Sequence, residues 1–173
     1  MNIQLLPLME EETIAFKEEM QEAFQQGFQA HFPNEEGNNQ WQVLPDKDFY
    51  QSLNAVGAEA YEALAADGQR VGGAIIVIKA DEHRGELAFL YVKVGVQSKG
   101  IGQTIWKAIE AMHPETKVWE TCTPYFDRRN IHFYINRCGF HAVEFFNEHH
   151  PDPNMPEQFD QEDGLFKFEK VMK

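Results

Sequence analysis

The sequence is poor in cysteine and in basic side chains, and each shortage excludes a class of protein. Its two cysteines, Cys122 and Cys138, are too few for a disulfide framework and suit free thiols in a reducing compartment. The 15 basic side chains face 28 acidic ones, and the net charge of -13 repels nucleic acid and anionic membrane surfaces. The acidic excess either attracts a cationic substrate or serves solubility alone, and both interpretations stay open.

Long hydrophobic runs are also missing. No stretch approaches the roughly 20 apolar residues of a membrane span, and the first residues lack the basic and apolar segments of a signal peptide. We therefore expect a cytoplasmic protein with no membrane and no nucleic-acid partner. The apolar fraction of 43%, with fourteen Phe, is typical of a compact globular protein, and we expect a single domain over residues 1–173.

The spacing of apolar residues predicts that strands and helices alternate only in the second half of the chain. Phenylalanines and Met20 recur every four residues between Phe16 and Phe28, which predicts a long helix after a short first strand. Asp67-Gly68 between two apolar runs predicts a hairpin, and Ile101, Ile105, Ile109 and Met112 predict one face of a later helix. Strands are expected at 3–8, 58–65, 70–79, 86–96, 117–122, 140–146 and 165–172, and further helices at 45–53 and 127–138.

A glycine-containing segment lies between the apolar run 86–96 and the helix after it. It reads Gln97-Ser98-Lys99-Gly100-Ile101-Gly102-Gln103. Backbone N–H groups at a helix N-terminus can face one pyrophosphate, glycines allow its close approach, and Lys99 can add a charged contact. The dinucleotide-binding motif G-x-G-x-x-G would need a glycine at position 105, which is Ile. No Gly-Lys-Ser/Thr occurs, so a P-loop is excluded as well. Glycine spacing alone leaves an ordinary strand-to-helix turn open as well.

The segment resembles the coenzyme A loop of the GNAT N-acetyltransferase superfamily. The signature Gln/Arg-x-x-Gly-x-Gly/Ala is matched by Gln97, Gly100 and Gly102, and the expected order of elements resembles that fold over nearly the whole chain. The resemblance implies a mixed α/β (α+β) structure, the acyl-CoA N-acyltransferase fold, with a splayed, mostly antiparallel sheet of about seven strands and about four helices. It also implies acetyl-coenzyme A as co-substrate, bound where the strand ending at Val96 parts from the strand 117–122.

The same resemblance assigns the contacts to the cofactor. Backbone around Tyr91 and Val94 would hold pantetheine and the thioester carbonyl, with Gly95 marking a bulge or close packing. Asn130 resembles a helix asparagine that contacts the cofactor in the superfamily, while a helix N-cap or surface role stays open. The expected cofactor-binding residues are Tyr91, Val92, Val94, Gln97, Ser98, Lys99, Gly100, Ile101, Gly102, Gln103 and Asn130.

Acyl transfer to an amine needs a base for the ammonium and an acid for the departing thiolate. Glu86 lies eleven residues before Gln97, where histone-acetyltransferase-like members carry their base; a solvated residue beside a turn is the alternative. Tyr134 resembles the acid of the superfamily, although it lies five residues before Gly139-Phe140 instead of the usual four; a packing role is the alternative. The fallback bases are Glu59, Glu62 and Glu120.

These residues predict transfer of an acetyl group to a primary amine, carried by a small molecule or a peptide, by direct attack in a ternary complex. A non-catalytic module that senses acyl-coenzyme A is the alternative, because it would need the same loop. Cys122 has no obvious activating neighbour for an acyl-enzyme. His149-His150 lacks a matched set of ligands, so no metal is expected. An exposed strand edge near the C-terminus suggests a homodimer.

Overall fold

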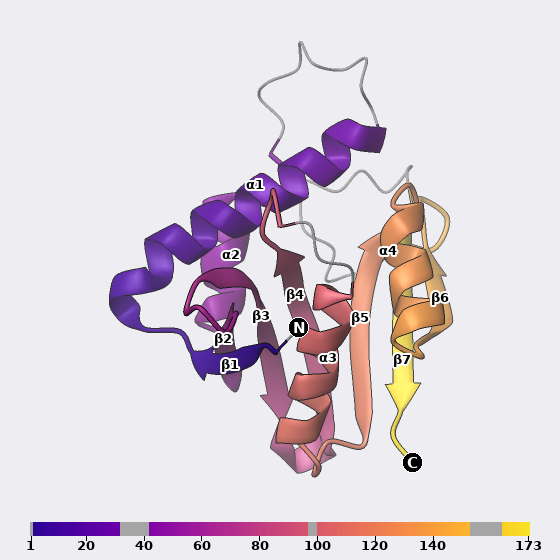
Figure 1. Cartoon of the computed structure of the whole chain (residues 1–173). Helices are drawn as coiled ribbons and strands as arrows, with labels where there is room; N and C mark the ends of the chain where they lie inside the picture. Colours follow the sequence, from indigo (N-terminus) through magenta and orange to yellow (C-terminus); the bar gives the residue numbers. More distant parts are fainter. Residues whose placement is uncertain (1, 32–41, 97–99, 153–163) are drawn as a thin grey trace.

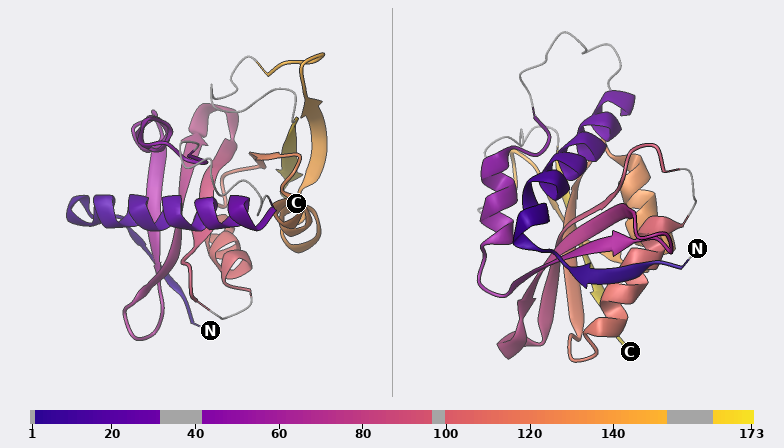
Figure 2. Two further views of the ribbon diagram at one scale, coloured as in Figure 1. Left: turned by 90° about the horizontal axis from the view of Figure 1, so that it is seen from above. Right: turned by 60° about the vertical axis from the view of Figure 1, so that its left-hand side comes forward.

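The computed structural model describes residues 2–31, 42–96, 100–152 and 164–173, which form one seven-stranded sheet with helices on both faces (Figures 1 and 2). The strands run in the order β1-β2-β3-β4-β5-β7-β6. Only β4 and β5 are parallel neighbours; every other pair is antiparallel. The strands are β1 (Gln4–Pro7), β2 (Ala58–Leu64), β3 (Arg70–Lys79), β4 (Arg84–Val92), β5 (Val118–Pro124), β6 (His141–Phe146) and β7 (Leu165–Val171).

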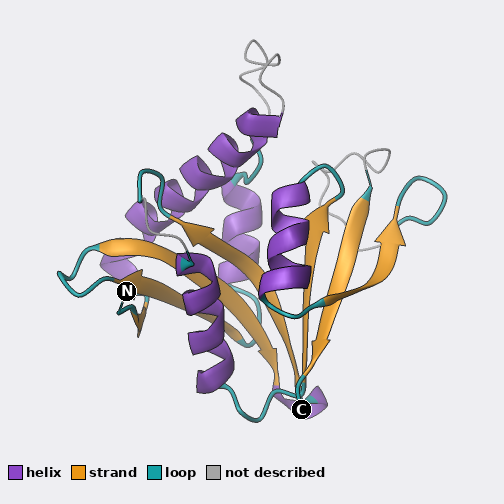
Figure 3. Cartoon of the chain, turned by 45° about the vertical axis from the view of Figure 1, so that its right-hand side comes forward, coloured by secondary structure: helices purple, strands orange, loops and turns teal. Residues whose placement is uncertain are grey.

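The helices divide between the two faces of the sheet (Figure 3). α1 (Thr13–His31), which follows a short 3₁₀ turn, and α2 (Asp46–Leu53) cover one face. α3 (Ile101–Met112) and α4 (Arg128–His132) cover the other. The expected seven strands, four helices and mostly antiparallel sheet are thereby confirmed. In the described part of the chain, no helix is both long and apolar enough to cross a membrane.

The face of the sheet under α3 holds the larger hydrophobic core. Ile101, Ile105 and Ile109 are buried there, as their four-residue spacing predicts. The Trp106 ring meets that of Trp119 on β5 edge to face, with centroids 5.1 Å apart. Met112 was expected on the same stripe but is 43% exposed, because α3 ends at this residue and the chain turns away.

α1 covers the opposite face with its phenylalanine stripe. Phe16 and Met20 are fully buried with Phe49 of α2, whereas Phe24 is only partly buried. Phe16 packs edge to face on Tyr91 of β4 at 5.4 Å between ring centroids. The side chains spaced four residues apart therefore face the sheet along α1, and they are less buried toward the C-terminal end of the helix.

β4 and β5 separate soon after they meet, and this separation shapes the site. They pair only from Arg84 to Glu86 on β4, opposite Val118 to Glu120 on β5. A β-bulge lies just beyond, because Ala88 is left unmatched between the pairs that β3 makes with Leu87 and Phe89. A bulge bends its strand, which accounts for the divergence. The opening expected between these two strands is confirmed.

Two details of β4 differ from the sequence prediction. The strand ends at Val92 instead of Val96, because residues 93–96 form a turn in which the Val96 N–H donates to the Lys93 carbonyl. Gly95 adopts a left-handed φ of 88° in that turn, so it marks the turn and the bulge lies at Ala88 instead. The apolar pattern continues through both segments, and it could not show where pairing to β3 stops.

β6 forms the outer edge of the sheet beside β7. Its residues from His141 to Phe145 are all exposed. An edge strand presents unpaired backbone groups to another chain. The homodimer expected from this edge stays a prediction.

Candidate active site between β4 and β5

The N-terminus of α3 carries the predicted anion loop. Gly100 is the N-cap residue with a left-handed φ of 85°, and a side chain there would meet open space. The first turn of α3, Ile101 to Gln103, has backbone N–H groups without an intrahelical partner, and the helix dipole favours an anion beside them. Gln97, Ser98 and Lys99, which carry half of the motif, lie outside the described residues.

Gly102 has a second role that its motif does not reveal. A Cβ at this position would lie 3.1 Å from Cζ of Phe133, so the absence of a side chain lets α3 pack closely on the segment after β5. The Gln103 side chain also donates to the Arg137 carbonyl at 2.8 Å. The two glycines of the motif therefore serve different needs: Gly100 permits the backbone conformation, and Gly102 permits the packing.

Beyond Leu87, whose carbonyl accepts from Thr121 of β5, the β4 backbone has the free edge that the cofactor would need. Tyr91 and Val92 pair with β3 on one side, and the described part of β5 does not pair with them on the other. The Tyr91 hydroxyl points away from this edge and donates to Glu19 of α1 at 2.9 Å. Val94 lies in the turn after β4, so its backbone does not continue the extended edge as expected.

Glu86 lies on the face of the sheet that α1 and α2 cover. Its neighbours Gly85 and Leu87 face the α3 core, where Gly85 abuts the Trp119 ring, so alternation along the strand points Glu86 the other way. Within the described ranges no hydrogen bond or ion pair reaches Glu86. Burial, and then the negative charge of Glu120, raise the pKa of this carboxyl above its ordinary value. A carboxylate with a raised pKa is suited to accept a proton near neutral pH.

Glu120, directly opposite on β5, has different surroundings. Its carboxylate oxygens lie 3.2 Å from Lys79 Nζ, 3.4 Å from Lys167 Nζ and 3.4 Å from an Arg84 guanidinium nitrogen. Burial acts to raise the pKa of Glu120, but the three cations outweigh burial and lower it. This fallback base is therefore already committed to ion pairs.

The other two fallback bases are also engaged. Glu59 accepts a hydrogen bond from the Tyr61 hydroxyl and lies 2.8 Å from Nε2 of His113. Glu62 accepts from Arg70 at 3.2 Å. Among the four carboxylates considered as base, Glu86 alone lacks a partner in the described part of the chain.

Tyr134 lies in a π-helical turn, Phe133–Arg137, that continues α4. The Cys138 N–H donates to the Phe133 carbonyl at 3.0 Å, five residues back along the chain. A π turn holds one residue more than an α turn, so it accommodates the extra residue between Tyr134 and Gly139. Gly139 ends the segment with a left-handed φ of 85°, as expected for a helix C-terminus.

The Tyr134 hydroxyl is held at the point where β4 and β5 part. Its ring packs among aromatic neighbours that include Phe140 and Phe168. Burial raises the pKa of Tyr134, and the nearby Thr121 hydroxyl of β5 opposes part of that rise. The Thr121 hydroxyl in turn donates to the Leu87 carbonyl of β4 at 2.8 Å. The candidate acid and base thus approach the opening from opposite faces of the sheet.

Thr121 is a site residue that the sequence did not reveal. It bonds to β4 across the opening and lies near the Tyr134 hydroxyl, yet a threonine in a strand is too common to stand out.

Asn130 is not the N-cap of α4. Asp127 holds that position, and its carboxylate accepts from the Asn130 backbone N–H at 3.0 Å. The N-cap interpretation of Asn130 is therefore wrong, because α4 begins at Arg128, two residues before Asn130. A cofactor contact from its side chain stays a prediction.

Cys122 lies two residues after Glu120 on β5 and is exposed, and no activating base contacts its thiol in the described part of the chain. Desolvation, and then the negative charges of Asp152 and Glu86, raise the pKa of its thiol to about 12. A thiolate is disfavoured there, which agrees with the absence of an acyl-enzyme from the expected mechanism.

The histidine pair does not form a metal cluster with its described neighbours. His149 contacts Glu148 and His150 contacts Glu144, and no group of three candidate ligands occurs in the described ranges. The expectation of a metal-free protein stays a prediction.

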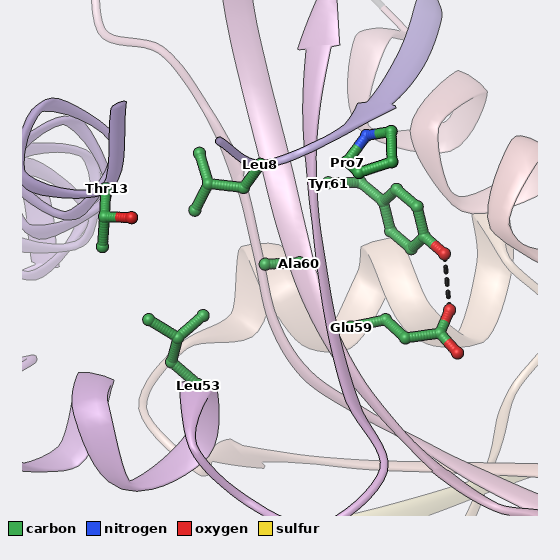
Figure 4. A pocket seen from close by; sticks show the side chains of 7 residues that line it. All are labelled: Pro7, Leu8, Thr13, Leu53, Glu59, Ala60 and Tyr61. Atoms are coloured by element: carbon green, nitrogen blue, oxygen red, sulfur yellow. Dashed lines mark hydrogen bonds between the residues drawn. The ribbon is translucent and has the colours of Figure 1, made fainter. Parts of the chain in front are cut away.

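A separate hollow of about 320 Å³ lies against β1 and β2, away from the opening (Figure 4). Its walls include Pro7, Leu8 and Leu53 and are mostly apolar. Its one carboxylate, Glu59, is bound by Tyr61 (Figure 4) and by His113. The groups that suit acyl transfer therefore lie at the opening between β4 and β5, and not in this hollow.

A helix N-terminus near a free strand edge, at a place where two parallel strands diverge, is the arrangement that an acyl-coenzyme A thioester would need. The match of residues 15–140 to the acetyltransferase (GNAT) family agrees with that arrangement. The chain belongs to the GNAT acetyltransferase family, and the resemblance found in its sequence is confirmed. Membership supports acetyl transfer from a coenzyme A thioester in general.

Individual relatives agree with this assignment. The chain is 46% identical over 138 residues to the uncharacterized protein YrkN of Bacillus subtilis (strain 168), a match that spans 76% of this chain and 74% of that protein. It shares its fold with a GNAT family acetyltransferase from Elizabethkingia anophelis with acetyl-CoA bound, at a TM-score of 0.69, 15% identity and 99% coverage of both chains. The PaiA N-acetyltransferase of Thermoplasma acidophilum in complex with coenzyme A gives a TM-score of 0.65 at 15% identity, covering 99% of this chain and 100% of that one.

Proposed function

We propose that the protein transfers an acetyl group from acetyl-coenzyme A to a primary amine by direct attack in a ternary complex. The observation that carries the proposal is the placement of Glu86 and Tyr134 on either side of the opening beyond the last β4–β5 pair. The first is a carboxyl without a described partner, and the second is a buried phenol. The similarity in fold to an enzyme named as an N-acetyltransferase supports nitrogen as the acceptor atom.

Each chemical need of the reaction has a group in this arrangement. The N-terminus of α3 and Gly100 would receive the pyrophosphate. The unpaired edge of β4 at Tyr91 and Val92 would bind pantetheine, and a backbone N–H there would stabilise negative charge on the thioester oxygen. The thioester carbonyl would then lie at the opening, which Glu86 and Tyr134 approach from opposite faces of the sheet.

The raised pKa values of Glu86 and Tyr134 suit these two groups to the proton transfers of the reaction. Glu86 would take a proton from the ammonium, directly or through water, so that the nitrogen lone pair can attack the carbonyl carbon. The carbon–sulfur bond breaks, and Tyr134 would give its proton to the departing thiolate. The nitrogen would lose its second proton as the amide forms, and that proton, passed through water, would restore the Tyr134 hydroxyl. Because burial raises the pKa of Tyr134, its hydroxyl stays protonated until a strong base forms beside it.

The first test is calorimetric titration of the chain with acetyl-coenzyme A, comparing Gly100→Glu with Gly68→Glu. Both glycines have φ of 85°, and a side chain at either one would meet open space, so the two variants carry similar backbone strain. Only Gly100→Glu places a carboxylate at the proposed pyrophosphate site. Micromolar binding that is lost in Gly100→Glu and kept in Gly68→Glu supports the proposal, whereas no binding by the native chain overturns it.

The second test separates an enzyme from a sensor by measuring thiol release with an amine panel. Tyr134→Phe should lower kcat by about 10²-fold or more and leave the affinity for acetyl-coenzyme A unchanged, since only the proton is removed. Binding without turnover of any amine by the native chain would instead identify a non-catalytic acyl-coenzyme A module.

A further inference from the structure

Thr121 lies at the inner end of the opening between β4 and β5. The last β4–β5 pair joins Glu86 to Glu120, so Leu87 and Thr121 occupy the next position along each strand. There the Thr121 side chain reaches β4, and its hydroxyl donates to the Leu87 carbonyl at 2.8 Å. Thr121 is 3% exposed and Leu87 is 1% exposed, so water has little access to this bond.

Thr121 and Tyr134 lie on the same face of the sheet. Thr121 is directly opposite Phe168 of β7, and the side chains of two opposite residues in an antiparallel pair point to the same face. The Tyr134 ring packs on the Phe168 ring with centroids 6.0 Å apart. Tyr134 is also buried. The candidate acid and the Thr121 hydroxyl are therefore neighbours, away from bulk water.

The hydrogen of the Thr121 hydroxyl has two competing acceptors. A threonine hydroxyl has one hydrogen to donate, and a carbonyl oxygen can only accept, so this hydrogen lies toward Leu87 in the structure. Once Tyr134 has lost its proton, its oxygen is an anion that can only accept as well. A hydrogen bond to an ionised acceptor is roughly twice as strong as one between neutral groups. The phenolate would therefore compete with the Leu87 carbonyl for the same hydrogen.

The surroundings of Tyr134 make such a donor valuable. Burial is the largest influence on the pKa of Tyr134 and raises it, whereas the Thr121 hydroxyl lowers it. A buried anion without a hydrogen-bond donor is costly in free energy. The Thr121 hydroxyl thus favours the state of Tyr134 that follows proton transfer.

We propose that Thr121 is a positioning residue for the candidate acid. Its hydroxyl donates to the Leu87 carbonyl while Tyr134 is protonated, and it turns about its Cβ–Oγ1 bond to donate to the Tyr134 oxygen after Tyr134 has protonated the departing thiolate. The proton that the nitrogen loses as the amide forms then restores the Tyr134 hydroxyl through water, and the Thr121 hydroxyl returns to Leu87. This inference rests on the proposed acetyl transfer and adds a residue to it.

The test measures thiol release from acetyl-coenzyme A for Thr121→Val and Thr121→Ser, with the amine that the native chain uses best. Valine has a similar shape without the hydroxyl, and serine keeps the hydroxyl. Thr121→Val should lower kcat about tenfold or more and leave the affinity for acetyl-coenzyme A unchanged, because it weakens the acid only. Thr121→Ser should restore most of kcat. A native kcat in Thr121→Val, or a Thr121→Ser variant as slow as Thr121→Val, would overturn the proposal.

Thr116→Val is the control for the loss of a buried threonine hydroxyl. Thr116 is 2% exposed and precedes β5, at the end of the strand remote from the opening. This variant should keep the native kcat. An equal loss of kcat in Thr116→Val and Thr121→Val would contradict a specific role for Thr121.

A double-mutant cycle separates this role from a purely structural one. In Tyr134→Phe no phenolate forms, so adding Thr121→Val should not lower kcat further. If the two losses multiply instead, Thr121 acts independently of Tyr134 and the proposal is wrong.

The two proposals fail in different ways. If acetyl-coenzyme A binds but the native chain releases thiol with no amine, acetyl transfer to amines is wrong, and the role of Thr121 is wrong with it. If the native chain acetylates an amine and Thr121→Val is equally fast, acetyl transfer stands and the role of Thr121 alone is wrong.

Discussion

Glu86 and Glu120 lie opposite each other on neighbouring strands, yet their pKa values shift in opposite directions. Both are partly buried, so desolvation acts on both in the same sense. Glu120 has three cations within 3.4 Å, and Glu86 has no partner in the described ranges. The cations keep Glu120 ionised, and its charge then makes ionisation of Glu86 harder. The charge of Glu120 thereby raises the pKa of Glu86, which suits Glu86 to the proposed role of base.

Glu86→Gln should lower kcat about 10²- to 10⁴-fold without changing the affinity for acetyl-coenzyme A, because it removes only the proton acceptor. The native rate should fall on the acidic side at a pH above the ordinary value of 4.5. Rate–pH profiles of the native chain and the variant measure both effects. Glu82→Gln, at an exposed position before β4, is the control and should keep the native profile. An unchanged rate in Glu86→Gln would remove this residue from the mechanism.

The same substitution should stabilise the fold at pH 7. A carboxyl whose pKa is raised by folding binds its proton more tightly in the folded state, so its ionisation opposes folding. Its contribution to stability is therefore lost as the pH rises from about 4.5 through the raised value, and glutamine does not titrate. Thermal unfolding should give a higher midpoint for Glu86→Gln at pH 7 and a smaller difference at acidic pH. A lower midpoint at pH 7 would indicate a favourable partner for Glu86.

At the scale of elements, α3 and the π-helical turn after α4 behave as one unit. Gly102 faces the Phe133 ring, and Gln103 bonds the Arg137 carbonyl. Tyr134 follows Phe133 directly, so the helix that would bind the pyrophosphate also supports the candidate acid. The motif glycine at 102 is explained by this packing, without any contact to a ligand.

Gly102→Ala should destabilise the protein by about 1–3 kcal/mol, because the new methyl group would lie 3.1 Å from the Phe133 ring and neither helix can move freely. Urea unfolding of Gly102→Ala, Phe133→Leu and the double variant separates the two roles of the glycine. If packing explains Gly102, the shorter leucine should restore stability and cofactor affinity in the double variant. If Gly102 instead admits the pyrophosphate, affinity stays low whatever residue occupies position 133.

Over the whole molecule, Arg70 joins α1 to the sheet. Its Nε and Nη2 donate to the two oxygens of Glu19 on α1 at 3.1 and 3.0 Å, and its Nη1 donates to Glu62 on β2. Glu19 also accepts from Tyr91 of β4. Burial acts to raise the pKa of Glu19, but the bonds from Arg70 and Tyr91 lower it below its ordinary value. The network holds α1 over the strand that lines the opening.

Arg70→Ala should destabilise the protein by about 3 kcal/mol at pH 7, the lower end of the cost of removing one partner from a buried ion pair. The Arg70 and Glu19 side chains are only 10% and 17% exposed, so water replaces little of the loss. A carboxyl with a lowered pKa stabilises the fold above its ordinary value and loses that contribution as the pH falls. The difference from the native chain should therefore shrink in acid.

Urea unfolding at pH 7 and at pH 4 measures the Arg70 effect. Lys117→Ala is the control, because Lys117 is exposed and its loss should change stability by less than about 0.5 kcal/mol. Equal effects of Arg70→Ala at both pH values would contradict the role assigned to Glu19.

Much of the fold could be predicted from local patterns in the sequence. Asp67-Gly68 marks the β2–β3 hairpin, and Gly139 ends its helix in the left-handed conformation that glycine tolerates. Backbone conformation and side-chain period act over a few residues, so these signals could be read directly. The π turn at Tyr134 was not predicted. The sequence showed only that Tyr134 lies one residue farther from Gly139 than usual, and the π turn explains that offset.

By itself the sequence determined the order of the elements, the glycine loop and the resemblance to the GNAT family, because each depends on residues that are close along the chain. Only the tertiary structure decided which carboxylate is left without a described partner. The resemblance favoured Glu86 over Glu59, Glu62 and Glu120, but the sequence could not show that these three are engaged. Their partners come from distant segments: Lys79 is 41 residues from Glu120, and His113 is 54 residues from Glu59. Charge and desolvation act through space, so the surroundings of each candidate base were decided only when folding brought those partners together.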